Sequence, residues 1–321
     1  MIKKLILFIL ILLSLKSFPQ QQIKKVQFIT TDVTNFWTAY DSLQTTIDTF
    51  KRINILQNLY FDKATIGLKY YIYAKSLTPE YMEEVIRTYP KFWNSVREQT
   101  IQVNSFEDCF ENIQKKLIKL YPHTHGCNVY FLIGGLKSGG LINGNNILIG
   151  TELATSNNCT NATELKKAMQ ERMQLNKNVL FILAHEYLHI QQNQSLSDST
   201  INVLTLSLKE GSADFIASLI TNENVPGAYM KYGSNNEKEI WMVFKKEMYT
   251  NEVMNWTFGG VHPSFNSKDL GYYVGYAICK SYYDNAVDKQ KGVKDIIELD
   301  YSNQQQINKF LINSKYPEKF N

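Results

Sequence analysis

The 321-residue chain lacks several features that would place it in a specialised class of protein. Its longest mainly apolar stretch, Leu5–Leu15, is too short to cross a membrane as a helix. There is no basic stripe either. The net charge of the whole chain is +4, and residues 1–20 contribute three lysines and no acids, so the rest of the chain has a net charge of about +1. This balance argues against a nucleic-acid partner. With 44% apolar residues, the chain can bury a substantial core in one large domain or two lobes.

The first 20 residues have the layout of a secretion signal. Lys3 and Lys4 precede the apolar stretch, and the chain turns polar from Lys16 onward. We expect cleavage between Ser17 and Gln21, a periplasmic or secreted mature protein, and no stable membrane insertion after the signal is removed. The alternative is an uncleaved membrane anchor. A lipid anchor is not expected, because no cysteine lies nearby.

Cysteine is also scarce. Four cysteines in an exported chain allow two disulfides: Cys109, Cys127, Cys159 and Cys279. Cys109 and Cys127 are close in sequence and form the first candidate pair. Cys279 lies in an apolar run, where a buried thiol is the alternative to a bridge.

Residues 21–126 form a mainly helical N-terminal region. Apolar residues recur there at spacings of three and four, with polar residues between them. The pattern predicts helices over residues 33–50, 79–87 and 105–119.

Residues 127–321 form a second region, which we expect to be one continuous globular unit with the first. It opens with short apolar runs typical of strands, at 129–133, 141–142 and 146–150. Between the last two runs, Asn143-Gly144 predicts a tight turn. The remainder has mostly helical patterns, so the fold class is α+β with a small mixed sheet.

The stretch His185-Glu186-Tyr187-Leu188-His189 is the most informative in the chain. Two imidazoles four residues apart share one face of a helix, so both can reach a single metal ion. Glu186 lies about 100° around the helix from His185, beside the metal, where it can hold and deprotonate a water molecule. The alternative is a core helix that carries histidines by chance, and its buried polar groups would then need other partners.

A catalytic zinc needs a third protein ligand and leaves its fourth position to water. The best candidate is Glu210, within a second amphipathic helix. Asp214 shares its face and would accept a hydrogen bond from the far nitrogen of a ligand histidine. Gly211 costs about 1 kcal/mol inside a helix, and a close approach to the metal helix would explain it. The alternative is a solvated Glu and Asp on a surface helix.

The pattern His-Glu-x-x-His, 20 intervening residues, then Glu-x-x-x-Asp resembles the gluzincin class of metallopeptidases. The Glu-Gly-x-Ala-Asp form, with the wider layout from about Asn35 to Tyr283, is similar to a family of bacterial predicted zinc-dependent proteases of unsettled substrate. The resemblance implies a zincin-like fold and one Zn²⁺ ion. The roles it implies are His185, His189 and Glu210 as zinc ligands, Glu186 as the base, and Asp214 as the carboxylate that orients a ligand.

In zinc peptidases of this class, one exposed edge of the sheet above the cleft holds an extended peptide by backbone hydrogen bonds. We place this edge at Asn146–Gly150, with Ile147, Ile149 and Gly150 beside the substrate. Glu152 follows the strand, and a glutamate at a similar place in zinc aminopeptidases grips the free amine of the substrate. That role would make the protein an exopeptidase. The alternative is an ordinary carboxylate in a loop or at a helix start.

Peptide hydrolysis also needs a donor for the oxyanion that forms at the attacked carbonyl. In gluzincins a His or Tyr from the C-terminal part of the chain supplies it. His262, Tyr273 and Tyr276 are the candidates here, and the sequence leaves the choice among them open. For each of the three, a purely structural role is the alternative.

The sequence therefore predicts an exported zinc peptidase that acts on peptides or proteins, with Glu186 as general base. A rival from another class is an exported binding or surface-assembly protein whose zinc site is structural or vestigial. A structural zinc normally has four protein ligands, and such a site has no use for Glu186. The oligomeric state is left open.

Overall fold

The computed structural model describes residues 26–172 and 179–320. The expected signal segment, residues 1–20, lies outside the described residues. Within them the expected α+β class is confirmed, because the chain is mainly helical and has one small mixed sheet. No helix in this part of the chain is both long enough and apolar enough to span a membrane.

Helices dominate the N-terminal region, after a first short strand. The elements are β1 (Gln27–Ile29), α1 (Thr31–Leu43), α2 (Thr49–Leu56), α3 (Ile66–Lys75), α4 (Pro79–Thr88), α5 (Pro90–Ile101) and α6 (Glu107–Leu120), with a π-helical turn at Gln57–Phe61 and a 3₁₀ turn at Gln102–Phe106. The helices expected over 79–87 and 105–119 are confirmed as α4 and α6. The one expected over 33–50 is two helices, because Asp48 starts a new one by accepting a 2.9 Å hydrogen bond from the Lys51 N–H.

The sheet has the strand order β1-β2-β4-β3 among the described residues. Its remaining strands are β2 (Asn128–Leu132), β3 (Gly140–Asn143) and β4 (Asn146–Gly150). β1, β2 and β4 are parallel, and β3 pairs antiparallel with β4. The expected hairpin is confirmed, with Gly144 at φ +55° in its turn.

The prediction that residues 146–150 form an exposed substrate edge is wrong. β4 is paired on both sides, with β2 through Asn146 to Gly150 and with β3 through Asn146 to Ile149. Its hydrogen-bonding groups are therefore used inside the sheet, and Ile147 and Ile149 are fully buried. The edge on this side of the sheet belongs to β3.

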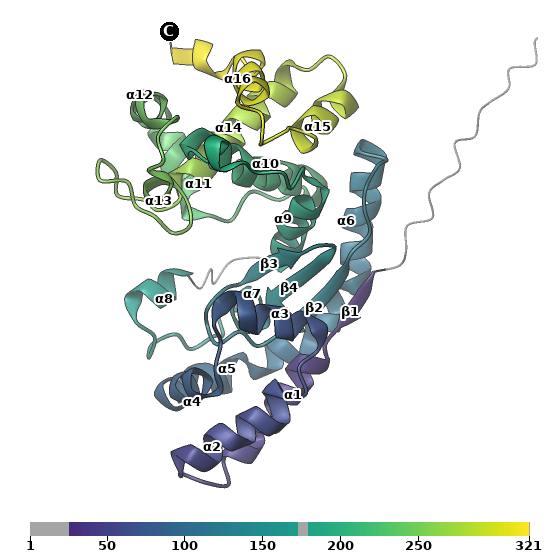
Figure 1. Ribbon diagram of the computed structural model, residues 1–321, viewed down its shortest axis with the longest axis vertical. Helices are drawn as coiled ribbons and strands as arrows, with labels where there is room; N and C mark the ends of the chain where they lie inside the picture. The colour runs from purple at the N-terminus through teal and green to yellow at the C-terminus, as the bar shows by residue number, and fades with distance from the viewer. Residues whose placement is uncertain (1–25, 173–178, 321) are drawn as a thin grey trace, which may run out of the picture.

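The sheet separates two helical layers (Figure 1). α1 contacts β2, and α3 contacts β2 and β4, whereas α9 (Val179–Gln191) contacts β3 and β4. Figure 1 shows α9 above the sheet, with α10 and the C-terminal helices beyond it and α1 to α3 below. The remaining helices are α7 (Thr151–Ala154), α8 (Lys167–Arg172), α10 (Val203–Thr221), α11 (Ala228–Asn235), α12 (Glu237–Glu247), α13 (Val253–Trp256), α14 (Leu270–Asn285), α15 (Lys289–Ile297) and α16 (Gln304–Asn313), with 3₁₀ turns at Asp198–Thr200 and Tyr316–Phe320.

Gly211 allows α10 and α14 to cross at very short range. A Cβ atom at Gly211 would overlap the backbone of Gly275 and Tyr276, and one at Gly275 would overlap the Ser207 carbonyl. The close approach expected from Gly211 therefore exists, but its partner is α14 and not the metal helix. This contact brings the start of α14 to the part of α10 that carries Glu210.

All four cysteines are free thiols. The expected pair Cys109–Cys127 is wrong, because Cys109 lies exposed on α6 whereas Cys127 is buried just before β2. Burial raises the pKa of the Cys127 thiol to about 12. Cys279 is a buried thiol, which is the alternative that the sequence offered for it.

Candidate metal centre

The helix that carries the His-Glu-x-x-His motif is fixed by the face that points away from its histidines. The Gln191 side chain accepts a 2.6 Å hydrogen bond from the His125 N–H and donates a 3.1 Å bond to the His125 carbonyl. Tyr187 donates to the same carbonyl at 2.9 Å. His125 thus holds the helix in place through hydrogen bonds of its own backbone. These bonds lie on the face opposite to the one that carries His185, Glu186 and His189.

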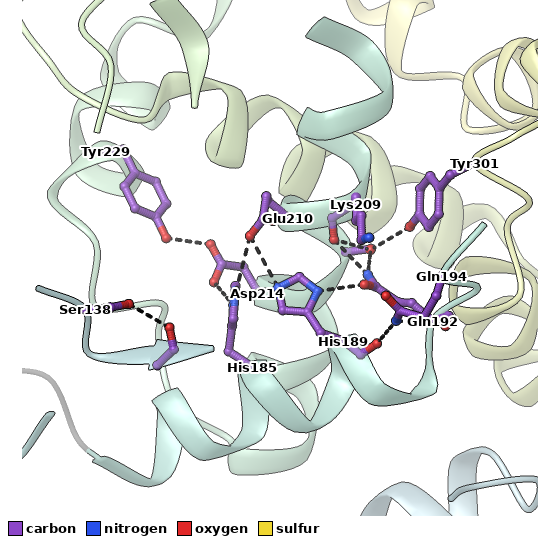
Figure 2. A network of polar contacts seen from close by, with 12 residues as sticks. Ser138, His185, His189, Gln192, Gln194, Lys209, Glu210, Asp214, Tyr229 and Tyr301 are labelled. Atoms are coloured by element: carbon purple, nitrogen blue, oxygen red, sulfur yellow. Dashed lines mark hydrogen bonds and ion pairs between the residues drawn. The ribbon is translucent and has the colours of Figure 1, made fainter. Parts of the chain in front are cut away.

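Three side chains converge between α9 and α10 (Figure 2). The Nε2 atoms of His185 and His189 are 3.0 Å apart, and Glu210 Oε2 lies 3.5 Å and 3.3 Å from them respectively. A tetrahedral zinc with bonds of roughly 2.0–2.1 Å would separate its ligand atoms by about 3.3 Å. The triangle therefore has the size that one zinc ion requires. Within the described part of the chain, the cluster of possible ligands consists of these three residues.

The far nitrogen of each imidazole faces an acceptor. His185 Nδ1 lies 2.8 Å from Asp214 Oδ1, and His189 Nδ1 lies 2.7 Å from Gln192 Oε1. Both Nδ1 atoms must therefore donate, which leaves each neutral imidazole with its Nε2 lone pair directed into the triangle. Two lone pairs only 3.0 Å apart repel each other unless a cation or a proton lies between them. This donor set fits zinc.

The charges around the triangle favour a cation. Burial alone would lower the pKa of His185, but hydrogen bonds to Asp214 and Glu210 outweigh it and raise the pKa to about 10 in the metal-free protein. Burial alone would raise the pKa of Glu210, but the neighbouring His189 and His185 hold it well below its usual range. Without zinc, a proton would thus take the position that zinc would occupy.

Two tyrosines complete the centre, and the sequence analysis missed both. The Tyr229 hydroxyl, on α11, donates to Asp214 Oδ2, so Asp214 is held by Tyr229 on one oxygen and by His185 on the other. Tyr272 lies in the first turn of α14. Burial, then the charge of the nearby Glu210, raises the pKa of Tyr272 well above its usual value. Its hydroxyl therefore stays protonated and close to the triangle.

A cleft of about 510 Å³ opens beside the cluster. Its lining includes His185 and Glu186 from α9, Gly140 from the edge strand, and Tyr229 and Tyr272 from the opposite side. Gly140 lies so close to Glu186 that a Cβ atom there would be 2.9 Å from the Glu186 Cδ atom. The edge strand thus passes directly over the carboxylate that the motif supplies.

The other carboxylate expected in the cleft, Glu152, lies elsewhere. It is fully buried and accepts hydrogen bonds from the Gly134 N–H at 3.0 Å and the Leu136 N–H at 2.8 Å. Burial raises its pKa to about 7. The expected grip on a substrate amine is therefore wrong, and Glu152 instead fixes the loop that leads to β3.

None of the three expected oxyanion donors lines the cleft. His262 packs on Trp256, its Nε2 faces Glu247 at 3.0 Å, and its Nδ1 accepts the Ser264 N–H at 3.1 Å. Both ring nitrogens are thus used within the C-terminal part.

The two tyrosines of the same prediction point away from the metal centre as well. Burial, then the charge of Glu237 at the start of α12, raises the pKa of Tyr273. Tyr276 packs edge-on against Phe215 with ring centroids 5.7 Å apart. Both therefore have the structural role that was their alternative.

The fold and the cluster define an α+β protein with a His-His-Glu centre beside an open cleft. Residues 163–303 match the model of a family described as "Predicted Zn-dependent protease (DUF2268)". This segment contains α9, α10 and α14, so it carries the three candidate ligands as well as Glu186, Asp214 and Tyr272. The resemblance to predicted zinc-dependent proteases is therefore confirmed over this part of the chain. Neither the curated proteins nor the solved structures gave a match to the chain.

Proposed function

We propose that this protein is a zinc-dependent peptidase, exported through its first 20 residues and built on a zincin-like fold. The observation that carries the proposal is the triangle of His185, His189 and Glu210, with Glu186 in the wall of the adjoining cleft. A structural zinc would normally have four protein ligands, whereas three with an open side is the arrangement of catalytic sites. The family match over residues 163–303 supports the same conclusion.

The protein groups have separate tasks in this reaction. Zinc in the triangle would act as a Lewis acid that lowers the pKa of water and polarises the peptide carbonyl. Glu186 is the general base, which takes a proton from the attacking water and gives it to the leaving amine. Asp214 keeps His185 in the tautomer that directs Nε2 at the metal position.

Tyr272 is the best-placed donor for the oxyanion. It lines the same cleft as His185 and Glu186, and after burial the charge of Glu210 is the largest cause of its raised pKa, which supports a position at the metal end of that cleft. Its raised pKa keeps the proton available for donation. Tyr229 is less suited, because its hydroxyl already donates its hydrogen bond to Asp214.

The substrate would lie along β3, not β4. β3 is the edge strand next to the cleft, and Gly140 lets an extended peptide approach Glu186 without a side chain in between. With Glu152 buried elsewhere, no amine-gripping role remains for it. We therefore expect acetylated peptides and peptides with a free amine to be cleaved at similar rates.

The test compares wild type with Glu186→Gln on a broad peptide library, with the zinc content of both proteins measured. The variant should keep zinc and the wild-type unfolding temperature while losing at least 100-fold in turnover, because general base catalysis is worth about 10²–10⁴-fold. Turnover of the variant at the wild-type rate would refute the mechanism. A zinc-loaded wild type that cleaves no library peptide would favour the structural-zinc rival.

A further inference from the structure

Gln192 is a buried amide that touches one residue of the triangle, His189, and the backbone carbonyl just before another, Glu210. Its Oε1 faces His189 Nδ1 at 2.7 Å, and its Nε2 donates to the Lys209 carbonyl and to Ser212 Oγ, both at 2.7 Å. It is only 4% exposed. From this geometry we infer that Gln192 is a positioning residue for the metal centre, an inference that rests on the zinc site of the proposed function.

The surroundings of the amide decide which way it points. The Lys209 carbonyl can only accept, so it must face the amide nitrogen. The oxygen is then directed at His189, whose Nδ1 has to donate and whose Nε2 is left to bind metal. Ser212, which accepts from the amide, is itself held in place, because its Oγ lies 3.2 Å from the hydroxyl of the fully buried Tyr301.

The same side chain also links the two helices that supply the ligands. Gln192 follows the last turn of α9, and Lys209 precedes Glu210 on α10. Its bonds therefore fix His189 relative to the peptide unit that carries Glu210, on the side opposite to Asp214. Each histidine thus has its own acceptor, a charged carboxylate for His185 and a neutral amide for His189.

A matched pair of variants separates this role from simple packing. Gln192→Met keeps the size of the side chain and removes its hydrogen bond to His189. Gln191→Met makes the same change one residue earlier, at a position that is 5% exposed and bonds the His125 backbone instead of a ligand. The readout is the zinc dissociation constant of each full-length protein, measured by competition with a chromogenic chelator, alongside the unfolding temperature of the metal-free form.

We expect Gln192→Met to weaken zinc binding about 10- to 100-fold, as the loss of a group that orients a metal ligand does. Gln191→Met should stay within about twofold of wild type in zinc affinity, while both variants lower the unfolding temperature. Equal zinc affinities of the two variants would overturn the inference. A wild type that binds no zinc would instead defeat the proposed function itself, so the two failures are distinguishable.

Gln192→Glu keeps the test decisive if Gln192→Met does not fold. A carboxylate still accepts a hydrogen bond from His189 Nδ1, so Gln192→Glu should bind zinc more tightly than Gln192→Met does. If Gln192→Met cannot be obtained, the zinc affinity of Gln192→Glu should be within about tenfold of that of wild type. Long-range ¹H–¹⁵N spectra of the zinc-loaded variant should show the proton of His189 on Nδ1. A proton on Nε2 in the zinc-loaded wild type would contradict the inference directly.

Discussion

Replacing Gly140 by alanine should weaken catalysis without disturbing the metal. The added Cβ atom would overlap Glu186 Oε1 and lie 2.9 Å from Cδ and 3.0 Å from Cγ, whereas ordinary contact begins at 3.4 Å. The Glu186 side chain must therefore move by roughly 0.5 Å or more. Because a 1 Å misplacement costs up to about 10²-fold in rate, we expect kcat/KM to fall about 10- to 100-fold, or about 1.4–2.7 kcal/mol of transition-state stabilisation.

Gly139→Ala is the matched control for this variant. A Cβ atom at Gly139 meets only Leu153 Cβ, at 3.9 Å, which is ordinary contact. Neither glycine has a positive φ, so alanine fits the backbone at both positions. The assay is peptide hydrolysis by the two zinc-loaded variants, with their zinc affinities measured in parallel. Wild-type activity in Gly140→Ala, or an equal loss in both variants, would refute the placement of the edge strand over Glu186.

Two further predictions concern groups that the sequence did not assign correctly. Tyr272→Phe should lower kcat about 10²–10³-fold, as removal of an oxyanion donor does, while Tyr273→Phe should stay close to wild type. Peptide hydrolysis, with zinc content as a control, tests both variants. Equal rates for the two would remove Tyr272 from the mechanism. Glu152 has its pKa raised by burial from 4.5 to about 7, so between these pH values the folded state binds more protons than the unfolded state and stability falls as pH rises. The loss of stability amounts to about 3 kcal/mol at most. Denaturant titrations at pH 5 and pH 8 should show that the free energy of unfolding depends less on pH in Glu152→Gln than in wild type. An unchanged pH dependence in the variant would contradict the assignment.

The parts of the site that could be predicted from the sequence are those fixed by local geometry. His185 and His189 share a helix face whatever surrounds them, and so do Glu210 and Asp214, because both pairs are four residues apart. The β3–β4 hairpin was likewise expected from Asn143-Gly144, although Asn143 pairs with Asn146 and the two residues of the turn are Gly144 and Asn145.

The order of the strands depends on contacts far apart in the sequence. β1 pairs Phe28 with Val129, and β2 then pairs with β4, which places β4 inside the sheet. One signal was available, because the unbroken apolar run Ile147-Leu148-Ile149 is typical of a strand that is covered on both faces. The more polar β3 was the better choice for an edge.

Tyr272 and Gln192 were missed for related reasons. The choice of Tyr273 and Tyr276 over Tyr272 was wrong because the crossing of α14 with α10 decides which face of α14 meets the cleft. Glycines in the sequence indicate such a crossing but do not show which helix is the partner. Gln192 belongs to the polar series at residues 191–194, which follows the apolar motif helix and is typical of a helix end. Its place three residues after His189 puts it on the same face, which is the signal that could have identified it.

The central claim is that His185, His189 and Glu210 hold one zinc ion that catalysis requires. The most direct test is the zinc content and peptidase activity of the purified chain, measured before chelation, after it, and after zinc is added back. The account predicts one zinc per wild-type chain, activity that disappears and returns with the metal, and neither zinc nor activity in His189→Ala. A wild type without zinc, or a His189→Ala variant that binds zinc as tightly as wild type does, would contradict it.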